Sequence, residues 1–436
     1  MSPLAAGIVG ILGFFILLIL RMPIAYAMAL VGFLGFSYLS SPSAAFRVVA
    51  KDIFSTFSSY SLSVIPMFVW MGFLAFYSGI GSRLYDFAYK LAGHLRGGLA
   101  IATQATCALF GAVCGSNTAT AATIGAIALP EMENYQYAPA LSTASVAAGG
   151  ALGVLIPPSV IFIVYGIATE QSIGKLFMAG IIPGILLMLL YMATISILAF
   201  YNPSLGPAGP KFSWKERLFA LRGGLWEVLT VFIISLGGLF AGWFTPTEAG
   251  AVGAGGVLVL TVLEKRLGWK EFNMSIADTT RTTAMIMFLV TGAVIFGRFI
   301  AVSRIPFEIA SWAGSLPLPP YAIIIIILTI YLVLGCFIDA LALVLLTTPI
   351  FYPVAVTTLG YDPIWFGVII VMVVAMGVIT PPVGMNVYII KGVAKDIPLE
   401  TIFGGIWPFL IAQIVCLALL IAFPQIATFL PEHLSY

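Results

Sequence analysis

Charge is scarce in this chain of 436 residues. Lys, Arg, Asp and Glu together make up 8% of it, hydrophobic residues make up 61%, and the mean hydropathy is +1.11. Soluble domains are about half apolar and about a quarter charged. The composition therefore excludes an ordinary soluble domain and indicates a protein that crosses a membrane several times. The net charge is +2 and no long basic run occurs, so nothing points to a nucleic-acid partner.

The residues that build common enzyme sites are also scarce. His94 and His433 are the only histidines, in an expected loop and in the tail, which excludes a histidine-based nucleophile or metal site inside the membrane. No phosphate-binding glycine loop and no pair of catalytic carboxylates occurs. The four cysteines lie in apolar segments without metal-ligand spacing, so we expect small core residues. The chain is not expected to be an enzyme.

One unusual sequence motif occurs twice. Residues 153–158 read GVLIPP and residues 377–382 read GVITPP, each inside an apolar segment. A double proline breaks a helix, because each ring removes an N–H donor and clashes with the preceding turn. In a bilayer the freed carbonyls are tolerated only where protein, a cavity or a bound ion supplies a partner. Two equivalent breaks predict a repeat-built transporter with its site near the membrane midplane.

The apolar windows predict the same layout for both halves of the chain, five spans and one re-entrant hairpin. The first repeat, residues 1–205, has spans at 4–20, 24–39, 62–80 and 176–201, an interfacial stretch at 40–59, a hairpin at about 97–131 and a broken helix at about 138–169. A basic linker, 206–223, holds Lys211, Lys215, Arg217 and Arg222. The second repeat, residues 224–436, has spans at 225–244, 249–263, 282–302 and 402–423, an amphipathic stretch at 264–280, a hairpin at about 318–358 and a broken helix at about 363–393.

Because five is an odd number of spans, the second repeat must enter the membrane from the opposite side. With the N-terminus outside, only Arg47, Lys51, Lys175, Arg298 and Arg304 of the 19 basic residues fall outside, which satisfies the positive-inside rule. The first basic residue is Arg21, so the start of the chain lacks the positive region of a cleaved signal and is expected to remain a span. The expected fold is an all-α polytopic membrane protein of two inverted repeats, with both termini in the periplasm.

The first predicted hairpin carries polar side chains midway through an apolar stretch. Ser116, Asn117 and Thr118 follow Gly115, and their oxygens suit a hard cation or a substrate carboxylate. The alternative is helix packing of small residues, with hydroxyls bonded to the preceding turn. That alternative explains the threonine but leaves the amide of Asn117 without a purpose.

The position that matches Gly115 in the second hairpin is Asp339. A carboxylate at membrane depth is costly and indicates a functional site. A bound sodium ion or a proton would neutralise Asp339, and the alternative is an ion pair with a distant base such as Arg298. Asn386 adds a buried amide near the second break. Glu248 is expected at a helix start that Thr245 or Thr247 caps, where its carboxylate suits the helix dipole, and the alternative is contact with the substrate.

These residues resemble the large membrane (M) subunit of TRAP transporters, the tripartite ATP-independent periplasmic systems. The resemblance covers essentially the whole chain and is most specific at 115–120 (GSNTAT), 156–159 (IPPS), 245–249 (TPTEA) and 380–386 (TPPVGMN). It implies sodium-coupled uptake of an organic acid delivered by a periplasmic substrate-binding protein, in a bacterial inner membrane. It also implies a separate small four-helix Q subunit, and an elevator mechanism in which a transport domain of hairpins and broken helices slides against a scaffold.

The resemblance further implies two sodium sites, each between a hairpin tip and a break. The expected ion ligands are Ser116, Asn117, Gly153 and Pro157 for the first site, and Asp339, Ala340, Gly377 and Thr380 for the second. The expected substrate contacts are Thr118, Pro158, Ser159, Pro382, Gly384 and Asn386. The second tip lacks the Ser-Asn-Thr sequence of the related sodium–dicarboxylate carriers, which puts its exact ligands in doubt.

Other readings remain open. The nearest is a stand-alone sodium- or proton-coupled carboxylate carrier of the same superfamily, working without a binding protein. Two further alternatives come from other classes of protein. A channel would show continuous conductance without saturation, and a membrane enzyme acting on lipid-like substrates would need a catalytic pair.

Overall fold

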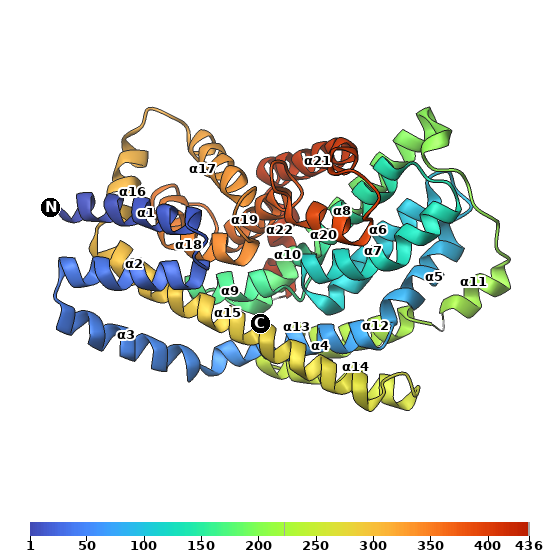
Figure 1. Cartoon of the computed structure of the whole chain (residues 1–436), viewed down its shortest axis with the longest axis horizontal. Coiled ribbons are helices and arrows are strands. Elements are labelled where there is room, and N and C mark those ends of the chain that lie inside the picture. The colour runs from blue at the N-terminus through green and yellow to red at the C-terminus, as the bar shows by residue number, and fades with distance from the viewer. Residues whose placement is uncertain (222, 435–436) are drawn as a thin grey trace.

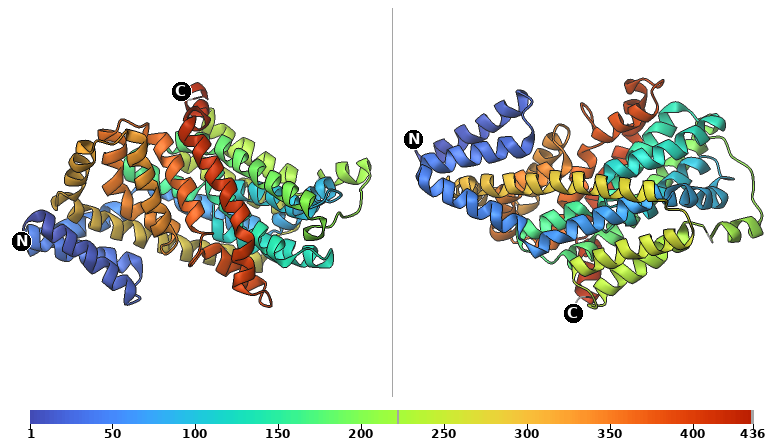
Figure 2. Two further views of the ribbon diagram at one scale, coloured as in Figure 1. Left: turned by 90° about the horizontal axis from the view of Figure 1, so that it is seen from above. Right: turned by 60° about the horizontal axis from the view of Figure 1, so that its bottom comes forward.

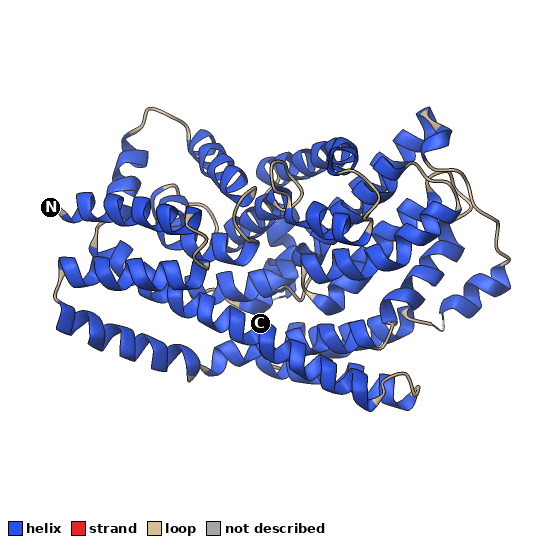
Figure 3. Cartoon of the chain, in the orientation of Figure 1, coloured by secondary structure: helices blue, strands red, loops and turns tan. Residues whose placement is uncertain are grey.

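The computed structural model describes residues 1–221 and 223–434, and Arg222 of the predicted linker lies outside them. These residues form helices and loops and contain no strand, which confirms the all-α prediction (Figure 3). Seven helical segments of the described chain are long and apolar enough to cross a bilayer, and several apolar helices are shorter. The chain is a multi-pass membrane protein.

The elements follow one another along the whole chain (Figure 1). In the first half they are α1 (Pro3–Ile19), α2 (Ile24–Leu39), α3 (Pro42–Phe57), the 3₁₀ turn η1 (Tyr60–Ser63), α4 (Val64–Tyr77), α5 (Ile80–Ala92), α6 (Gly98–Cys114), α7 (Asn117–Asn134), α8 (Pro139–Leu155), α9 (Val160–Thr169), α10 (Ile173–Tyr201) and the 3₁₀ turn η2 (Pro203–Leu205). In the second half they are α11 (Trp214–Leu221), α12 (Leu225–Phe232), the π-helical η3 (Ile233–Gly237), α13 (Gly238–Phe240), α14 (Pro246–Leu263), α15 (Trp269–Val302), α16 (Ile305–Ser315), α17 (Pro320–Gly335), α18 (Ala340–Tyr352), the π-helical η4 (Pro353–Thr358), α19 (Pro363–Gly377), α20 (Met385–Val393), α21 (Leu399–Ala422) and α22 (Gln425–Leu434).

Several helix starts are set by a polar cap followed by proline at the first helical position. At α14, the Thr245 side chain accepts from the Glu248 N–H, and the Glu248 carboxylate accepts from the Thr245 N–H, which makes a capping box. The prediction that Glu248 lies at a capped helix start is confirmed. At α19, the Asp362 carboxylate accepts from the N–H of Trp365 at 2.7 Å.

The centre of the molecule is built from α8 and α19, which hold the segments before the two double prolines. Every residue from Leu141 to Leu155 in α8 and from Ile364 to Gly377 in α19 is buried. Helices that are apolar on all sides are buried by other helices. Here α8 packs against α6, α7, α21 and α19, and α19 packs against α17 and α18 (Figures 1 and 2). Both double prolines therefore lie at the ends of central helices.

Matching glycines bring each hairpin onto its own central helix. A Cβ added to Gly111 in α6 would lie 2.8 Å from the Gly153 Cα in α8, and one added to Gly377 in α19 would lie 2.7 Å from the Gly335 carbonyl carbon at the end of α17. Glycine permits such backbone contact because it has no Cβ. The same pair of sequence positions, 224 residues apart, makes the same contact in each half.

The structure differs from the predicted spans in two places. The predicted amphipathic stretch 264–280 and span 282–302 are largely one continuous helix, α15, of 34 residues. No proline interrupts α15, and its first glycine is Gly292. The corresponding region of the first half is broken by η1 between α3 and α4. The predicted span 62–80 ends early, because α4 stops at Tyr77 and α5 begins at Ile80.

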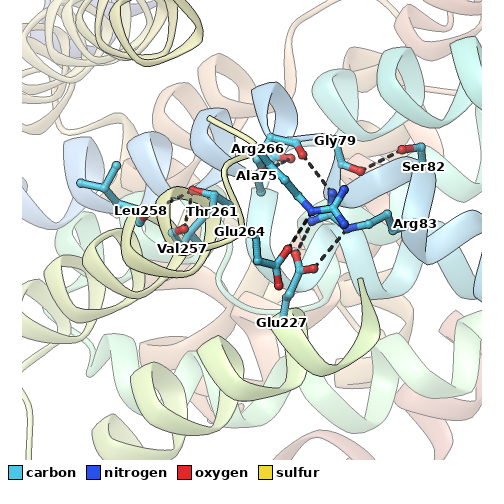
Figure 4. A network of polar contacts seen from close by, with 11 residues as sticks. Ala75, Gly79, Ser82, Arg83, Glu227, Val257, Leu258, Thr261, Glu264 and Arg266 are labelled. Atoms are coloured by element: carbon cyan, nitrogen blue, oxygen red, sulfur yellow. Dashed lines mark hydrogen bonds and ion pairs between the residues drawn. The ribbon is translucent and has the colours of Figure 1, made fainter. Parts of the chain in front are cut away.

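A buried ion pair fastens the start of the second half to the first. Glu227 in α12 is 1% exposed, and its carboxylate accepts from the Arg83 guanidinium in α5, whose Nη1 also donates to the Ser78 carbonyl at 3.0 Å (Figure 4). A charge-assisted pair with two donors in a fork is among the strongest hydrogen-bonded contacts in proteins. The pair fixes α12 against α5 near the linker.

Candidate functional site

The tip of the first hairpin is short. Helix α6 ends at Cys114, and Gly115 takes a left-handed conformation with φ of 64°, which glycine adopts without strain. Ser116 then caps α7, its Oγ accepting from the Ala119 N–H at 3.4 Å and lying 3.1 Å from the Thr118 hydroxyl. The tip thus places a hydroxyl cluster at a helix N-terminus.

This tip rests directly on the first break. A Cβ added to Gly153 would lie 2.8 Å from the Ser116 carbonyl oxygen and 2.6 Å from the Thr120 hydroxyl oxygen, and one added to Gly115 would lie 2.5 Å from the Pro158 carbonyl oxygen. The structure therefore brings together Ser116, Gly153 and Pro158.

The first break leaves backbone carbonyls without helical partners. The carbonyls of Gly153 and Val154 would accept from positions 157 and 158, but both are prolines without an N–H. The described residues supply neither carbonyl with another hydrogen-bond donor. Pro157, Pro158 and Ser159 are all buried, and the Ser159 Oγ caps α9 by accepting from the Phe162 N–H at 3.4 Å. Carbonyl and hydroxyl oxygens of this kind fit a hard monovalent cation.

The second break is longer, and the carbonyls of Gly377 and Val378 are bonded. The Gly377 carbonyl accepts from the Thr380 N–H at 3.2 Å, and the Val378 carbonyl accepts from the Asn386 N–H at 2.9 Å. The Thr380 hydroxyl donates to the Met376 carbonyl at 2.7 Å. Pro382 is exposed, and Gly384 has a φ of 58° directly before α20. The two carbonyls that match Gly153 and Val154 of the first break are therefore bonded here.

Asp339 forms the end of the second tip and caps α18. Its Oδ1 accepts from the N–H groups of Leu341 at 3.0 Å and Ala342 at 3.5 Å. The alternative of an ion pair with Arg298 is wrong, because that guanidinium binds Asp52 in α3, with Nε 3.2 Å from Oδ2. Sequence reasoning missed the cap, although an aspartate directly before an apolar helix is a signal for one.

Asn386, predicted as a substrate contact, lies fully buried between the two halves. Its amide nitrogen donates to the Ala147 carbonyl in α8 at 3.0 Å, and its amide oxygen accepts from the Asn117 amide at 3.4 Å. The two amides connect the first hairpin tip to the start of α20. The sequence indicated both amides as buried but not their contact.

The two hairpin tips meet at one cavity of about 470 Å³. Of the predicted site residues, it is lined by Ser116, Asn117, Thr118, Asp339 and Ala340. The remaining predicted residues, Gly153, Pro157, Pro158, Ser159, Gly377, Thr380, Pro382, Gly384 and Asn386, lie outside its lining. The volume is in the range of small-molecule sites. The sequence predicted two separate tip–break sites, whereas the structure brings the tips of both hairpins to one space.

Sequence reasoning missed the other wall of this cavity, which α4 and α15 supply and which we call the α4–α15 wall. It includes Tyr77, Asp278 and Thr282, and the Tyr77 hydroxyl donates to the Asp278 carboxylate. Asp278 lies four residues before Thr282, so both share one helix face. The available sequence signal for this wall was Asp278, a carboxylate at the edge of the predicted span 282–302.

Comparison of the sequence with known proteins identifies a family. Residues 11–426 match the family model described as tripartite ATP-independent periplasmic transporter, DctM component. The C4-dicarboxylate TRAP transporter large permease protein DctM of Pseudomonas aeruginosa is 38% identical over 89% of this chain and 90% of its own length. The sialic acid TRAP transporter large permease protein SiaM of Vibrio cholerae is 34% identical over 97% of each chain. The ectoine/5-hydroxyectoine large permease protein UehC of Ruegeria pomeroyi is 34% identical over 96% of each.

A solved structure shares the fold. The crystal structure of the Alcanivorax borkumensis YdaH transporter has a TM-score of 0.61 and 14% sequence identity, covering 89% of this chain and 90% of that one. The relatives named above are transporter permeases, which confirms the prediction that the chain is not an enzyme. The chain belongs to the DctM family, the large permease components of TRAP transporters.

Proposed function

We propose that this permease takes up an organic acid together with sodium ions, and that the cavity between the two hairpin tips is its substrate site. The observation that carries the proposal is the meeting of the Ser116–Thr118 and Asp339–Ala340 tips at one cavity, with the unbonded carbonyls of Gly153 and Val154 behind the first tip. Neutral oxygens beside the first tip and a carboxylate at the second fit two cations. The N-termini of α7 and α18 suit a substrate carboxylate.

Sodium would make binding of the acid cooperative. A cation at the first break orders the Ser116 tip, and a cation at Asp339 removes the repulsion between that carboxylate and an anionic substrate. The two ligands then strengthen each other's binding, and the coupling is reciprocal. The chain's own part is to hold the oxygens of tip and break in place.

Alternating access would follow from an elevator motion of two inverted repeats. The cavity lies between the tips, which belong to the predicted transport domain, and the α4–α15 wall, which belongs to the predicted scaffold. A site at such a boundary can be exposed on either side of the membrane when one part slides against the other.

The family membership supports two partners, a periplasmic binding protein that delivers the acid and a small four-helix membrane subunit. The distribution of basic residues supports both termini of this chain in the periplasm. The alternative of a stand-alone carrier differs in one measurable respect, because it needs no binding protein for uptake.

The test is uptake by proteoliposomes that contain this chain and the small subunit, supplied with the binding protein and the acid that co-purifies with it. Uptake should require both an inward sodium gradient and the binding protein. Equal uptake with potassium in place of sodium would refute sodium coupling. Uptake of the free acid without the binding protein would favour the stand-alone carrier.

A further inference from the structure

The cavity has an unbalanced charge. Among the described residues its lining contains the carboxylates of Asp278 and Asp339 and no Lys, Arg or His. Where water is excluded, like charges repel each other more strongly. The free-energy cost of bringing a third negative charge into the cavity is therefore raised. An acid with two carboxylates would therefore meet an anionic wall at one of its ends.

The two carboxylates differ in how they are compensated. Asp339 accepts two backbone N–H groups at the start of α18 and, in the proposed function, faces a sodium ion. Asp278 accepts the single hydroxyl proton of Tyr77. A carboxylate has about four acceptor positions, so Tyr77 leaves most of them free.

Among the described residues, Arg281 is the one base within ion-pair distance of the Asp278 carboxylate, and it compensates that charge weakly. The Arg281 Nη1 lies 4.0 Å from the Asp278 Oδ1, at the limit of an ion pair, and the Arg281 side chain is 87% exposed. An exposed pair at this distance contributes little. Arg281 does not line the cavity. Asp278 thus presents a net negative charge on the α4–α15 wall.

We propose that Asp278 contacts the end of the substrate that is remote from the substrate's carboxylate and selects a cationic nitrogen there. The preferred substrate is then a zwitterion and not a dicarboxylate. This inference rests on the proposed function, in which the hairpin tips and their ions hold the carboxylate. Tyr77 orients the Asp278 carboxylate by its hydrogen bond. A second substrate carboxylate is rejected by repulsion, which is a common source of specificity.

The first experiment compares two probes that differ only at the remote end. Glutarate and 4-aminobutyrate share one carboxylate and a three-carbon chain, and butyrate serves as the probe without a remote charge. Their affinities are measured by thermal stabilisation of the purified permease complex, with sodium or with potassium. We expect sodium-dependent binding of 4-aminobutyrate about tenfold tighter than that of glutarate.

Three variants test whether Asp278 causes the preference for 4-aminobutyrate over glutarate. Asp278→Asn should remove the preference for 4-aminobutyrate over glutarate, whereas Tyr77→Phe, which keeps the charge, should keep it. Asp86→Asn is the matched control, because Asp86 pairs with Lys90 on the surface of α5 away from the cavity. Tighter binding of glutarate by the unmodified chain, or an unchanged preference in Asp278→Asn, would overturn the inference and leave sodium-coupled carboxylate binding intact. Absence of sodium-dependent binding by all three probes would overturn this inference, whereas the proposed function fails only if uptake of the co-purified acid does not depend on sodium.

A second measurement does not depend on folding of the Asp278 variant. Thr118→Cys places a thiol in the cavity, and its labelling by a cationic and an anionic thiosulfonate is compared after correction for their rates with free cysteine. The unsubstituted chain gives the background from Cys114, which also lines the cavity. Faster labelling by the cation supports the inference, and faster labelling by the anion contradicts it.

Discussion

The two tip–break pairs start from the same sequence phrase and end as different structures. In the first pair the tip is only Gly115 and Ser116, the break is buried, and the carbonyls of Gly153 and Val154 have no donor among the described residues. In the second pair the tip ends in a carboxylate, the break extends from residue 378 to 384, and its carbonyls accept from Thr380 and Asn386. The repeat keeps the glycine contact and changes the polar groups around it.

This difference suggests two ways to stabilise a cation beside a broken helix. The first pair offers neutral oxygens that the prolines have freed. The second offers the charge of Asp339 beside a break in which the carbonyls of Gly377 and Val378 already have donors. Buried charge is costly and buried neutral carbonyls are less so. The contributions of the two tip–break pairs can therefore be measured separately. Each variant below removes a charge, fills a close contact or removes a hydrogen bond in one pair at a time.

The largest effect is expected at Asp339. Asp339→Asn keeps a good N-cap for α18 but removes the charge. We expect the apparent sodium affinity of uptake to fall by about a hundredfold, equivalent to about 3 kcal/mol, while expression stays unchanged. The matched control is Asp362→Asn, since Asp362 also caps a helix, α19, and does not line the cavity. Equal sodium affinity in Asp339→Asn and the unmodified chain would remove Asp339 from the ion site.

The next effect concerns the glycine contact that both halves share. A Cβ on Gly111 would lie 2.8 Å from the Gly153 Cα, whereas a Cβ on Gly335 meets nothing closer than 3.4 Å. Gly111→Ala should therefore lower the free energy of unfolding by about 2 kcal/mol through overpacking, and Gly335→Ala should change it by less than about 0.5 kcal/mol. Denaturation in detergent micelles, followed by tryptophan fluorescence, measures both. Equal losses would mean that the first pair is no tighter than the second.

Much of this comparison could be predicted from the sequence, because helix breaking is a local property. The double prolines, the polar run at Ser116 and the lone carboxylate at Asp339 are visible without a structure, and the all-helical class follows from composition. Local signals also explain the cap at Glu248, which the structure confirms.

The rest depends on contacts between distant segments. Nothing in the sequence near Asn386 indicates that its amide reaches Asn117 and Ala147, or that Asp52 takes the guanidinium of Arg298. The α4–α15 wall was missed because only packing brings Tyr77 to Asp278. The continuity of α15 is a different case: no proline or glycine lies between residues 269 and 291, so the sequence itself favours one helix through the polar stretch.

A smaller effect is expected where the two pairs are joined. Asn386→Ala removes the hydrogen bonds to Ala147 at 3.0 Å and Asn117 at 3.4 Å, and leaves the buried Asn117 amide without its acceptor. We expect a loss of about 1.5 kcal/mol in the free energy of unfolding. Asn117→Ala is the control and should cost less, because it removes only the longer contact. A larger loss in Asn117→Ala would show that the first tip, and not α20, holds the junction.

The smallest effect separates the cavity from the break within the first pair. Ser116 and Ser159 both cap a helix through an N–H at 3.4 Å, but only Ser116 lines the cavity. Because the caps are long, Ser116→Ala and Ser159→Ala should each lower the free energy of unfolding by about 0.5 kcal/mol, the low end for a lost cap. Only Ser116→Ala should also raise the sodium concentration needed for half-maximal uptake. If Ser159→Ala raises it equally, the ion is held by the break as a whole, and the hydroxyl at the tip has no separate role.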